Sequence, residues 1–581
     1  MKRIRLAKAI LWFLIVLSTA FGVLLFLAAF VLPVQIVSKY IYAFSLPGAT
    51  WIFGLTGIIL LATGILLWKS RLRIQSQLGE ALAHSSKDME ELVSTVREAL
   101  LGDRAYLYAL LSITLLATAA RILFLFQPIR YDEAFTLIEF AAESFSAVIS
   151  DYHVPNNHVF HTMQVYVVYH LLGEHPWMLR LPAVSAGIAL VPASFLLGRI
   201  LYTKQTGLLT ASLVAASPLL IDYSTNARGY MLVTLFFVMT LGLSAYVRQK
   251  QNRVAWFLIP ILASLGFWTI PTMLYPFGIV MLWAFLSTLA GDASSRARAT
   301  IVRRLVISGL LAALLTILLY LPIFMNSGVS SVIANPFVSP LPWTDFVTQL
   351  PTLLFSTWEQ WTLSLPNLLV AILLAATLIS ITFHRHLASH RIPVLLPVIV
   401  WCPLVLISTR AIPFTRVWLF LLPLLLMIAS SGFLFLFQRV RLLERSQAFA
   451  IATLVITLLL LAILVLPHVT AVGAPGRSEE ITSFLESDLE PPDRVLAFTP
   501  FDYELLYYFR QRGIPDEHLL DRGHLNGRVL ILVDEEKAQT PEQVLRTTGL
   551  AGVVRLDTAR VVRQFDAALL YEVDPPAEEQ Y

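Results

Sequence analysis

The chain has 581 residues, of which 57% are hydrophobic and only 14% charged, and its mean hydropathy is +0.72. A soluble protein carries roughly 25% charged residues, so this composition excludes an ordinary soluble enzyme. The net charge of +4 is small for this length and gives no sign of nucleic-acid binding. The single cysteine, Cys402, lies in an apolar run, which excludes a disulfide framework and a cysteine metal site.

Apolar runs of about 20 residues recur along most of the chain, which predicts an all-α polytopic membrane protein. The first run follows a basic start and is too long for a cleaved signal peptide, so we expect it to be retained. We predict about thirteen transmembrane helices, at 9–33, 49–68, 105–126, 178–200, 205–221, 228–247, 254–270, 272–290, 302–324, 366–383, 393–409, 414–437 and 447–467.

Basic residues gather in every second loop, as at Arg71–Arg73, Arg248–Arg253 and Arg296–Arg304, and the opposite loops hold few. Cytoplasmic loops carry an excess of Lys and Arg, so we predict a multi-pass protein of the cell membrane with a cytoplasmic N-terminus. An odd number of spans then places the C-terminus outside. The loop after the third span also falls on the extracytoplasmic side.

Composition divides the chain into three domains. Residues 1–104 are predicted to form a two-span hairpin and a cytosolic helical linker, because apolar residues recur at helical spacing between 69 and 104. Residues 105–469 form the transmembrane domain. Residues 470–581 are predicted to form a small external α/β domain. Its expected strands are Arg494–Phe498, Val529–Val533 and Ala568–Val573, and its expected helices are Tyr503–Gln511 and Pro541–Thr547.

The external loop between the third and fourth spans has about 50 residues, and loops of that length are usually functional. Asp132 and Glu133 lie near its start, at the membrane boundary, where carboxylates are costly to desolvate and usually have a function. Segments Ala134–Val148 and Val159–Leu172 are amphipathic, and we expect helices lying in the membrane interface.

Other polar residues are expected on the same external face. Asn156 or Asn157 is predicted to cap the second interfacial helix, and His158 and His161 share one face of it. Further along the chain, Arg180 opens the fourth span, and Asp222 and Arg228 lie at the outer ends of the fifth and sixth. The motifs that carry this set, in chain order, are Tyr131-Asp132-Glu133, Asn157-His158, Gly173, Arg180-Leu181-Pro182, Ser224 and Ala227-Arg228-Gly229-Tyr230.

This ordered set resembles bacterial membrane glycosyltransferases similar to dolichyl-phosphate-mannose protein mannosyltransferases and the lipid A aminoarabinose transferase, which share the GT-C fold. The resemblance covers residues 105–325 well and the later spans loosely. The chain departs from it at Asn157-His158-Val159-Phe160-His161, where many relatives have His-Pro-Pro. This difference leaves the role of the loop histidines open.

The resemblance implies transfer of a sugar from a polyprenyl-phosphate-linked donor to a glycan, lipid or protein acceptor outside the membrane, with inversion. It implies a catalytic pair, Asp132 as general base and Glu133 as second choice. It implies donor phosphate binding by Arg228, Arg180 and His158. Asp222, His161, Tyr230 and Asn157 are the expected substrate-binding residues. No cofactor is expected; a divalent metal on the two histidines is an alternative that their spacing does not favour.

Each assignment has a structural alternative. Asp132 and Glu133 could cap the following helix, Asp222 and Arg228 could form a structural ion pair, and Arg180 could anchor its span. Segment 325–365 is interpreted either as a substrate-covering loop or as an interfacial connector. Arg410 and Arg416 either contact lipid phosphate or anchor their segments at the membrane surface. The competing functions are a transporter or flippase for a lipid-linked glycan and a surface-glycan polymerase or ligase.

Overall fold

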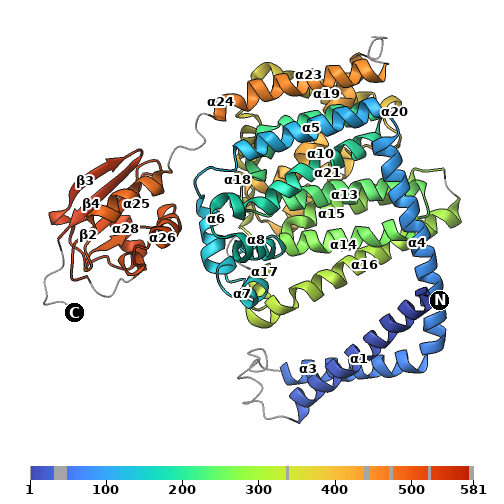
Figure 1. The fold of residues 1–581 in the computed structure, drawn as a ribbon, viewed down its shortest axis with the longest axis horizontal. Helices are drawn as coiled ribbons and strands as arrows, with labels where there is room; N and C mark the ends of the chain where they lie inside the picture. Colours follow the sequence, from blue (N-terminus) through green and yellow to red (C-terminus); the bar gives the residue numbers. More distant parts are fainter. Residues whose placement is uncertain are drawn as a thin grey trace.

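The computed structural model describes residues 2–31, 49–292, 294–334, 339–437, 445–469, 476–520 and 525–574. A bundle of helices fills most of the molecule, and a small mixed sheet with its own helices lies at one end of it (Figure 1). Within these ranges, seven helices are long and apolar enough to cross a membrane, and two bent helix pairs raise the number to nine. The polytopic helical class is therefore confirmed.

The helices of the bundle, here called the body, begin at Arg104. They are α5 (Arg104–Leu123), α10 (Leu181–Leu201), α11 (Lys204–Ala216), α12 (Pro218–Ser224), α13 (Tyr230–Gln249), α14 (Arg253–Thr269), η3 (Pro271–Met273), α15 (Leu274–Leu289), α16 (Ser295–Asn326), α17 (Ser330–Ile333), α18 (Trp343–Thr362), α19 (Asn367–Thr382), α20 (His384–Leu387), α21 (Leu395–Thr409), η4 (Thr415–Phe420), α22 (Leu421–Leu436), α23 (Ser446–Leu464) and α24 (Leu466–Val469). All thirteen predicted segments are helical over their described parts, while the number that cross the membrane stays a prediction.

Prolines account for the two bends. Pro218 follows Ser217 at the start of α12, and the chain turns by 63° between α11 and α12. Pro366 precedes α19, and the turn between α18 and α19 is 114°. A proline lacks the N–H that would continue the preceding helix but fits the first turn of a new one, so each bend lies where the sequence requires it.

Small residues bring the body helices close together. A Cβ atom at Gly432 in α22 would lie 1.8 Å from the carbonyl oxygen of Ala376 in α19. A Cβ at Gly207 in α11 would lie 2.4 Å from the carbonyl oxygen of Phe195 in α10. Such contacts are typical of helices in a membrane, where packing replaces the hydrophobic effect between helices.

The N-terminal part consists of a helix pair, α1 (Lys2–Phe30) and α3 (Ala49–Lys69), and one long helix, α4 (Arg71–Leu101). The helix predicted between 69 and 104 is thus confirmed. It also touches the body, because the backbone N of Arg253 donates to Asp88 Oδ2 at 2.9 Å and Asn252 Nδ2 donates to the Asp88 carbonyl at 2.6 Å. These bonds satisfy groups at the start of α14.

The loop between α5 and α10, which was predicted to be external, differs from its prediction in one half. The expected helix at 134–148 is broken into α6 (Tyr131–Thr136), a π-helical turn η2 (Leu137–Ala141) and α7 (Phe145–Ser150). Ser144 causes the break, since its hydroxyl caps α7 by accepting from Ala147 N at 3.2 Å. The second expected helix is α8 (Val159–Leu172), followed by the short α9 (Pro176–Leu179). The predicted cap by Asn156 or Asn157 is wrong: the N-cap residue is His158, without a side-chain cap bond.

The C-terminal domain has a four-stranded sheet of order β1-β2-β4-β3, with β1 and β2 parallel and the other pairs antiparallel. The strands are β1 (Arg494–Leu496), β2 (Val529–Asp534), β3 (Arg560–Phe565) and β4 (Ala568–Val573). The helices are α25 (Arg477–Asp488), α26 (Phe501–Arg512), α27 (Glu517–Leu520) and α28 (Pro541–Thr548). All five predicted elements are present, and β3, α25 and α27 were not predicted.

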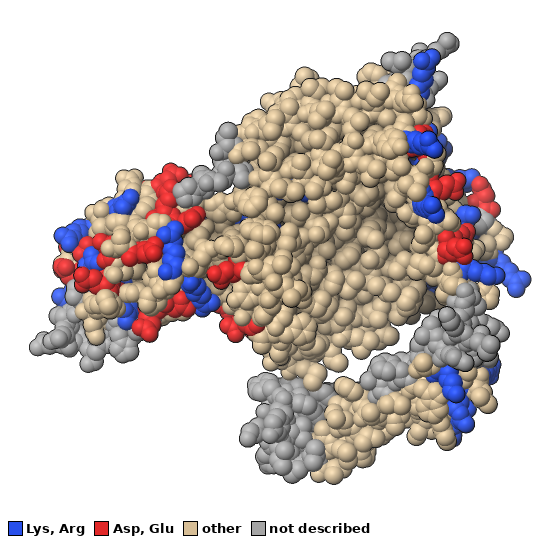
Figure 2. Space-filling view, viewed as in Figure 1, with Lys and Arg blue, Asp and Glu red and all other residues tan. Residues whose placement is uncertain are grey.

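Charge is distributed unevenly over the molecule. Figure 2 shows an almost uncharged surface on the body, with charged residues of both signs at the end away from the C-terminal domain and on that domain. An uncharged surface of this kind is expected of a helix bundle that lies in a membrane.

We expect the loop that contains Glu143 and the loop that contains Ser295 to face opposite sides of the membrane. Both residues are exposed, and the native Cys402 is buried. Cysteines introduced as Glu143→Cys and Ser295→Cys should react with an impermeant thiol reagent, the first from outside intact cells and the second only after permeabilisation. Labelling of both from the same side would contradict the orientation.

Candidate functional site

Glu133 and Arg180 form a buried ion pair in the loop between α5 and α10. The side chains are 2% and 0% exposed, and Arg180 Nη2 and Nε lie 2.6 and 2.8 Å from the two carboxylate oxygens. The backbone N–H groups of Arg130 and Ala227 also donate to Glu133, at 2.9 and 2.6 Å. A carboxylate with this many donors is well compensated for the loss of water.

The remaining donors of Arg180 are also taken. Nη1 donates to the carbonyls of Leu125 and Gln127 at 2.8 and 2.7 Å, and Nη2 donates to that of Pro128 at 2.7 Å. A guanidinium has five N–H donors, so Arg180 keeps none for a phosphate in this arrangement. Burial raises the pKa of Glu133, but Arg180 more than offsets this and leaves the pKa below its ordinary value. The pair therefore has the geometry of a clamp, which joins the end of α5 to α6 and α10.

Asp132, the next residue to Glu133, has a different environment. Its side chain is 28% exposed, and Oδ2 lies 3.1 Å from Arg416 Nη1 and 4.0 Å from Arg228 Nη2. Arg416 belongs to η4, more than 280 residues away in sequence. Asp132 is thus a solvent-accessible carboxylate between two cations.

Arg228 is 3% exposed and has polar contacts on several sides. Nη1 donates to Thr136 Oγ1 at 3.1 Å and to the carbonyl of Asn156 at 3.0 Å, and Nη2 lies 3.2 Å from His158 Nε2. These partners come from α6 and from the turn before α8. Arg228 therefore connects both parts of the loop between α5 and α10 to the start of α13.

His158 is fixed in position and in charge. Its Nδ1 accepts the backbone N–H of Gly229 at 2.9 Å, so a neutral ring carries its proton on Nε2. Burial and the neighbouring Arg228 hold the pKa of His158 well below its ordinary value. The ring also meets Tyr230 edge to face at 5.1 Å, and Arg416 lies 5.7 Å from the centre of the Tyr230 ring. A neutral histidine here packs beside the cations without adding charge.

Asp222 pairs with Arg130, not with Arg228. The distance from Asp222 Oδ1 to Arg130 Nη2 is 2.5 Å, and Arg130 also donates to Gln127 Oε1 at 2.9 Å. The structural alternative that paired Asp222 with Arg228 is therefore wrong. Next to Asp222, Tyr223 accepts a hydrogen bond from Gln360 of α18 at 3.1 Å and stacks edge to face on Tyr230.

Asn157 and His161 are fully buried on the inner side of the loop. Asn157 Nδ2 donates to the carbonyls of Val148 and Asp151 at 2.9 and 2.8 Å, which folds the chain between α7 and α8. Burial lowers the pKa of His161 to about 3. Several buried side-chain atoms around this point lack a hydrogen-bond partner within the described part of the chain: Asn157 Oδ1, both ring nitrogens of His161, Thr162 Oγ1, Asn226 Oδ1 and the Nε atoms of Arg228 and Arg416. Buried polar atoms are normally paired, so this region has bonding capacity for a substrate.

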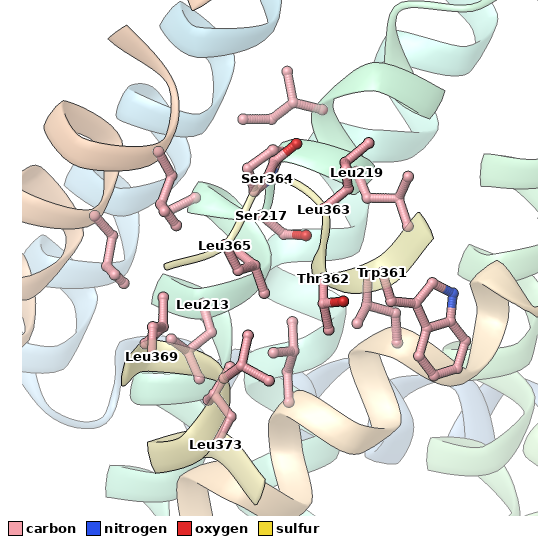
Figure 3. A pocket seen from close by; sticks show the side chains of 18 of the residues that line it. Leu213, Ser217, Leu219, Trp361, Thr362, Leu363, Ser364, Leu365, Leu369 and Leu373 are labelled. Atoms are coloured by element: carbon pink, nitrogen blue, oxygen red, sulfur yellow. The ribbon is translucent and has the colours of Figure 1, made fainter. Parts of the chain in front are cut away.

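A cavity of about 560 Å³ lies beside the charged residues, between α11, α12, α18, α19, α22 and α23. Leucine is the commonest residue in its wall, which also includes Trp358 and Trp361 of α18. Figure 3 shows several of these leucines together with Trp361. Its polar lining residues are Gln127, Asp222 and Gln360, together with Ser217, Thr362, Ser364, Thr377 and His468. Asp132, Arg228 and Arg416 do not line the cavity. Two contacts link its lining residues to the residues around them: the Asp222–Arg130 pair and the Gln360–Tyr223 hydrogen bond.

Six of the predicted site residues thus fall into two groups: Asp132, Arg228, His158 and Tyr230 meet in one cluster, while Glu133 and Arg180 form the clamp beneath it. Of the other three, Asp222 pairs with Arg130, and Asn157 and His161 are buried in the loop between α5 and α10. Sequence reasoning missed Arg130 and left Arg416 undecided between phosphate contact and anchoring. The signal for Arg416 was its place at the outer start of a predicted span. In the described ranges, no three His, Cys, Asp or Glu residues are grouped as metal ligands would be.

No protein-family model and no curated protein sequence matches the chain. Among solved structures, ArnT from Cupriavidus metallidurans in the apo state has a TM-score of 0.54 at 12% identity, with 81% of this chain and 98% of that chain covered. The same protein bound to undecaprenyl phosphate has a TM-score of 0.52 at 12% identity, with 80% and 98% covered. The Archaeoglobus fulgidus oligosaccharyltransferase with Zn and sulfate has a TM-score of 0.39 at 14% identity, with 70% and 57% covered.

The chain has the fold of ArnT. At 12% identity the likeness concerns the fold, and it confirms the structural resemblance to GT-C membrane glycosyltransferases that the motifs predicted. It extends over nearly the whole length of the ArnT chain.

We expect Arg180→Lys to destabilise the protein although it keeps the charge. A lysine has three donors where Arg180 uses five, and the loss of hydrogen bonds to a buried charged partner should cost about 3 kcal/mol. Thermal unfolding of the detergent-purified protein measures this. Arg510→Lys, which alters an exposed pair with Asp516, is the matched control and should change stability by less than about 1 kcal/mol. Equal melting temperatures for the two variants would contradict the clamp.

Proposed function

We propose that the chain is a membrane glycosyltransferase that moves a sugar from a polyprenyl-phosphate-linked donor to an acceptor on the extracytoplasmic side. One observation carries the proposal: Asp132, an accessible carboxylate, lies between two arginines, one before α13 and one in η4, that are far apart in the body sequence. A carboxylate and two cations are what a displacement at a sugar phosphate requires, one to take a proton and the others to stabilise the leaving phosphate.

The apolar cavity supports a lipid-linked donor. Its leucine-rich wall fits an isoprenoid chain, and its polar end at Asp222 and Gln127 points toward the charged cluster. The similar ArnT structure was solved with undecaprenyl phosphate bound, which is a ligand of this kind. We assign the cavity to part of the polyprenyl tail and the region around Asp132 to the sugar phosphate.

The reaction then follows from the charges. The Asp132 carboxylate removes the proton of the acceptor nucleophile, which forms a bond to the anomeric carbon. The bond from that carbon to the phosphate oxygen breaks, and its electron pair stays on the phosphate. Arg416 and Arg228 stabilise the growing negative charge, since a guanidinium can meet two phosphate oxygens at once. A single displacement of this kind inverts the anomeric centre.

The other predicted residues receive supporting roles in this proposal. His158 stays neutral and packs beside Arg228, and Tyr230 packs between His158 and Arg416. Glu133 and Arg180, predicted as second base and phosphate ligand, instead hold α6 in place. His161 and Asn157 remain candidates for sugar hydroxyl groups, because each keeps a buried polar atom without a partner in the described chain.

Asp132→Asn should lower turnover by at least about 100-fold with folding retained, because it keeps the size and removes the proton acceptor. The assay measures transfer from a polyprenyl-phosphate sugar by the purified protein. Asp345→Asn, at an exposed acid of α18, is the matched control and should leave turnover unchanged. Near-normal transfer by Asp132→Asn would refute its role as the base.

Arg416→Lys and Arg228→Lys should each lower kcat by about 10-fold or more while changing the donor KM much less. The phosphate gains charge only as its bond to the sugar breaks, so bidentate contact matters most in the transition state. Arg410→Lys serves as the control, because the Arg410 guanidinium lies over Trp343 at 5.5 Å. Equal effects on kcat at all three positions would contradict specific phosphate contact.

A further inference from the structure

The short helix that carries Asp132 is held on its outer side by the C-terminal domain. α6 has only six residues, and a helix of that length has almost no stability by itself. Its orientation is therefore set by neighbours. The clamp of Glu133 and Arg180 fixes it from below. Helix α26 of the C-terminal domain packs on the side away from the body (Figure 1).

Tyr503 of α26 is the centre of this contact. Its ring lies 4.4 Å from that of Phe135, centre to centre, and meets the ring of Tyr131 edge to face at 5.8 Å. Its hydroxyl donates to Glu139 Oε1 at 2.7 Å. Tyr131 and Phe135 are four residues apart and so share one face of α6. Tyr503 thus contacts both rings of that face and reaches the π-helical turn that follows.

Two further contacts fix the first turn of α6. Thr499 Oγ1 lies 3.0 Å from Tyr131 Oη. The carboxylate of Glu504 lies beside the backbone N–H of Tyr131, one of the N–H groups that a helix leaves unpaired at its start. Glu504 also accepts from the Ser478 hydroxyl at 2.5 Å, which joins α26 to α25. Two parts of the C-terminal domain, the segment at Thr499 and helix α26, therefore meet the first turn of α6.

Asp132 follows Tyr131 directly, so its side chain leaves the helix about 100° further round. None of the C-terminal contacts above touches the Asp132 carboxylate. They instead set the direction in which it points, and with it the 3.1 Å contact to Arg416. A misplacement of about 1 Å at a reacting group can cost about 100-fold in rate.

We propose that the C-terminal domain is a working part of the catalytic site, because Tyr503 positions α6 so that Asp132 faces Arg416 and Arg228. The inference rests on the proposed function for the meaning of Asp132. Tyr503 is a positioning residue. It acts through Phe135, Tyr131 and Glu139 and does not meet the sugar or the phosphate.

The test uses the full-length protein with Tyr503→Ala, Tyr503→Phe and Val544→Ala. Val544 is fully buried in the core on the other side of the sheet, among Leu496, Val529 and Ile531, so its truncation loosens the domain without touching α6. Two quantities are measured: hydrogen exchange of the amides of residues 131–141, and kcat with the donor KM.

Tyr503→Ala should speed exchange in 131–141 by at least about 10-fold and lower kcat by about 10- to 100-fold, with the donor KM within about 3-fold. Tyr503→Phe keeps the ring contacts and should retain kcat within about 3-fold of the natural protein. Val544→Ala should lower the melting temperature while leaving kcat and exchange in 131–141 unchanged. This separation of kcat from KM and from melting temperature is not expected of a purely structural residue.

Unchanged exchange in 131–141 for Tyr503→Ala would overturn the inference, and so would an equal loss of kcat in Val544→Ala. If Tyr503→Ala does not fold, Thr499→Val provides the comparison, with smaller changes in the same direction. Hydrogen exchange requires no turnover. A natural protein without any sugar transfer would therefore refute the proposed function, while the exchange data would still decide whether α26 holds α6.

Discussion

The buried pair of Glu133 and Arg180 is the interaction on which the rest of the charged face depends. Arg180 donates to the carbonyls that follow α5, and Glu133 accepts from the amides of Arg130 and Ala227. Three segments that are distant in sequence, at residues 125–133, 180 and 227, thus meet at one ion pair. A buried pair adds little net stability compared with apolar packing, but its loss leaves an uncompensated charge, so it fixes one arrangement of the chain strongly.

Above this pair, neighbouring residues have opposite properties. Glu133 is buried and hydrogen-bonded to several N–H donors, whereas Asp132 is accessible to solvent and faces two arginines. The contrast arises because successive residues of a helix point about 100° apart. One residue can anchor the helix while the next is left for chemistry. The contact with the C-terminal domain shows the same division, because Tyr503 packs on Phe135 and does not touch Asp132.

Much of the fold followed from the sequence, because apolar length and loop charge decide where helices lie in a membrane protein. The break at Ser144 did not, since a capping hydroxyl inside an amphipathic run gives no periodic signal. Strand β3 was missed because its first five residues are exposed and lack alternation. For the site, the order of the motifs along the chain predicted Asp132 and Arg228. The partners Arg130 and Arg416 could not be matched to their carboxylates, since pairing across 92 and 284 residues depends on packing alone.

The placement of Asp132 between two arginines has a consequence for the order of events. While its carboxylate lies beside both guanidiniums, Asp132 occupies the cations that a phosphate would need. In the proposed reaction, an incoming phosphate competes for the same cations and releases the carboxylate as it binds. The base is thus free for the acceptor only after the donor has arrived. Such a site favours ordered binding, donor first and acceptor second.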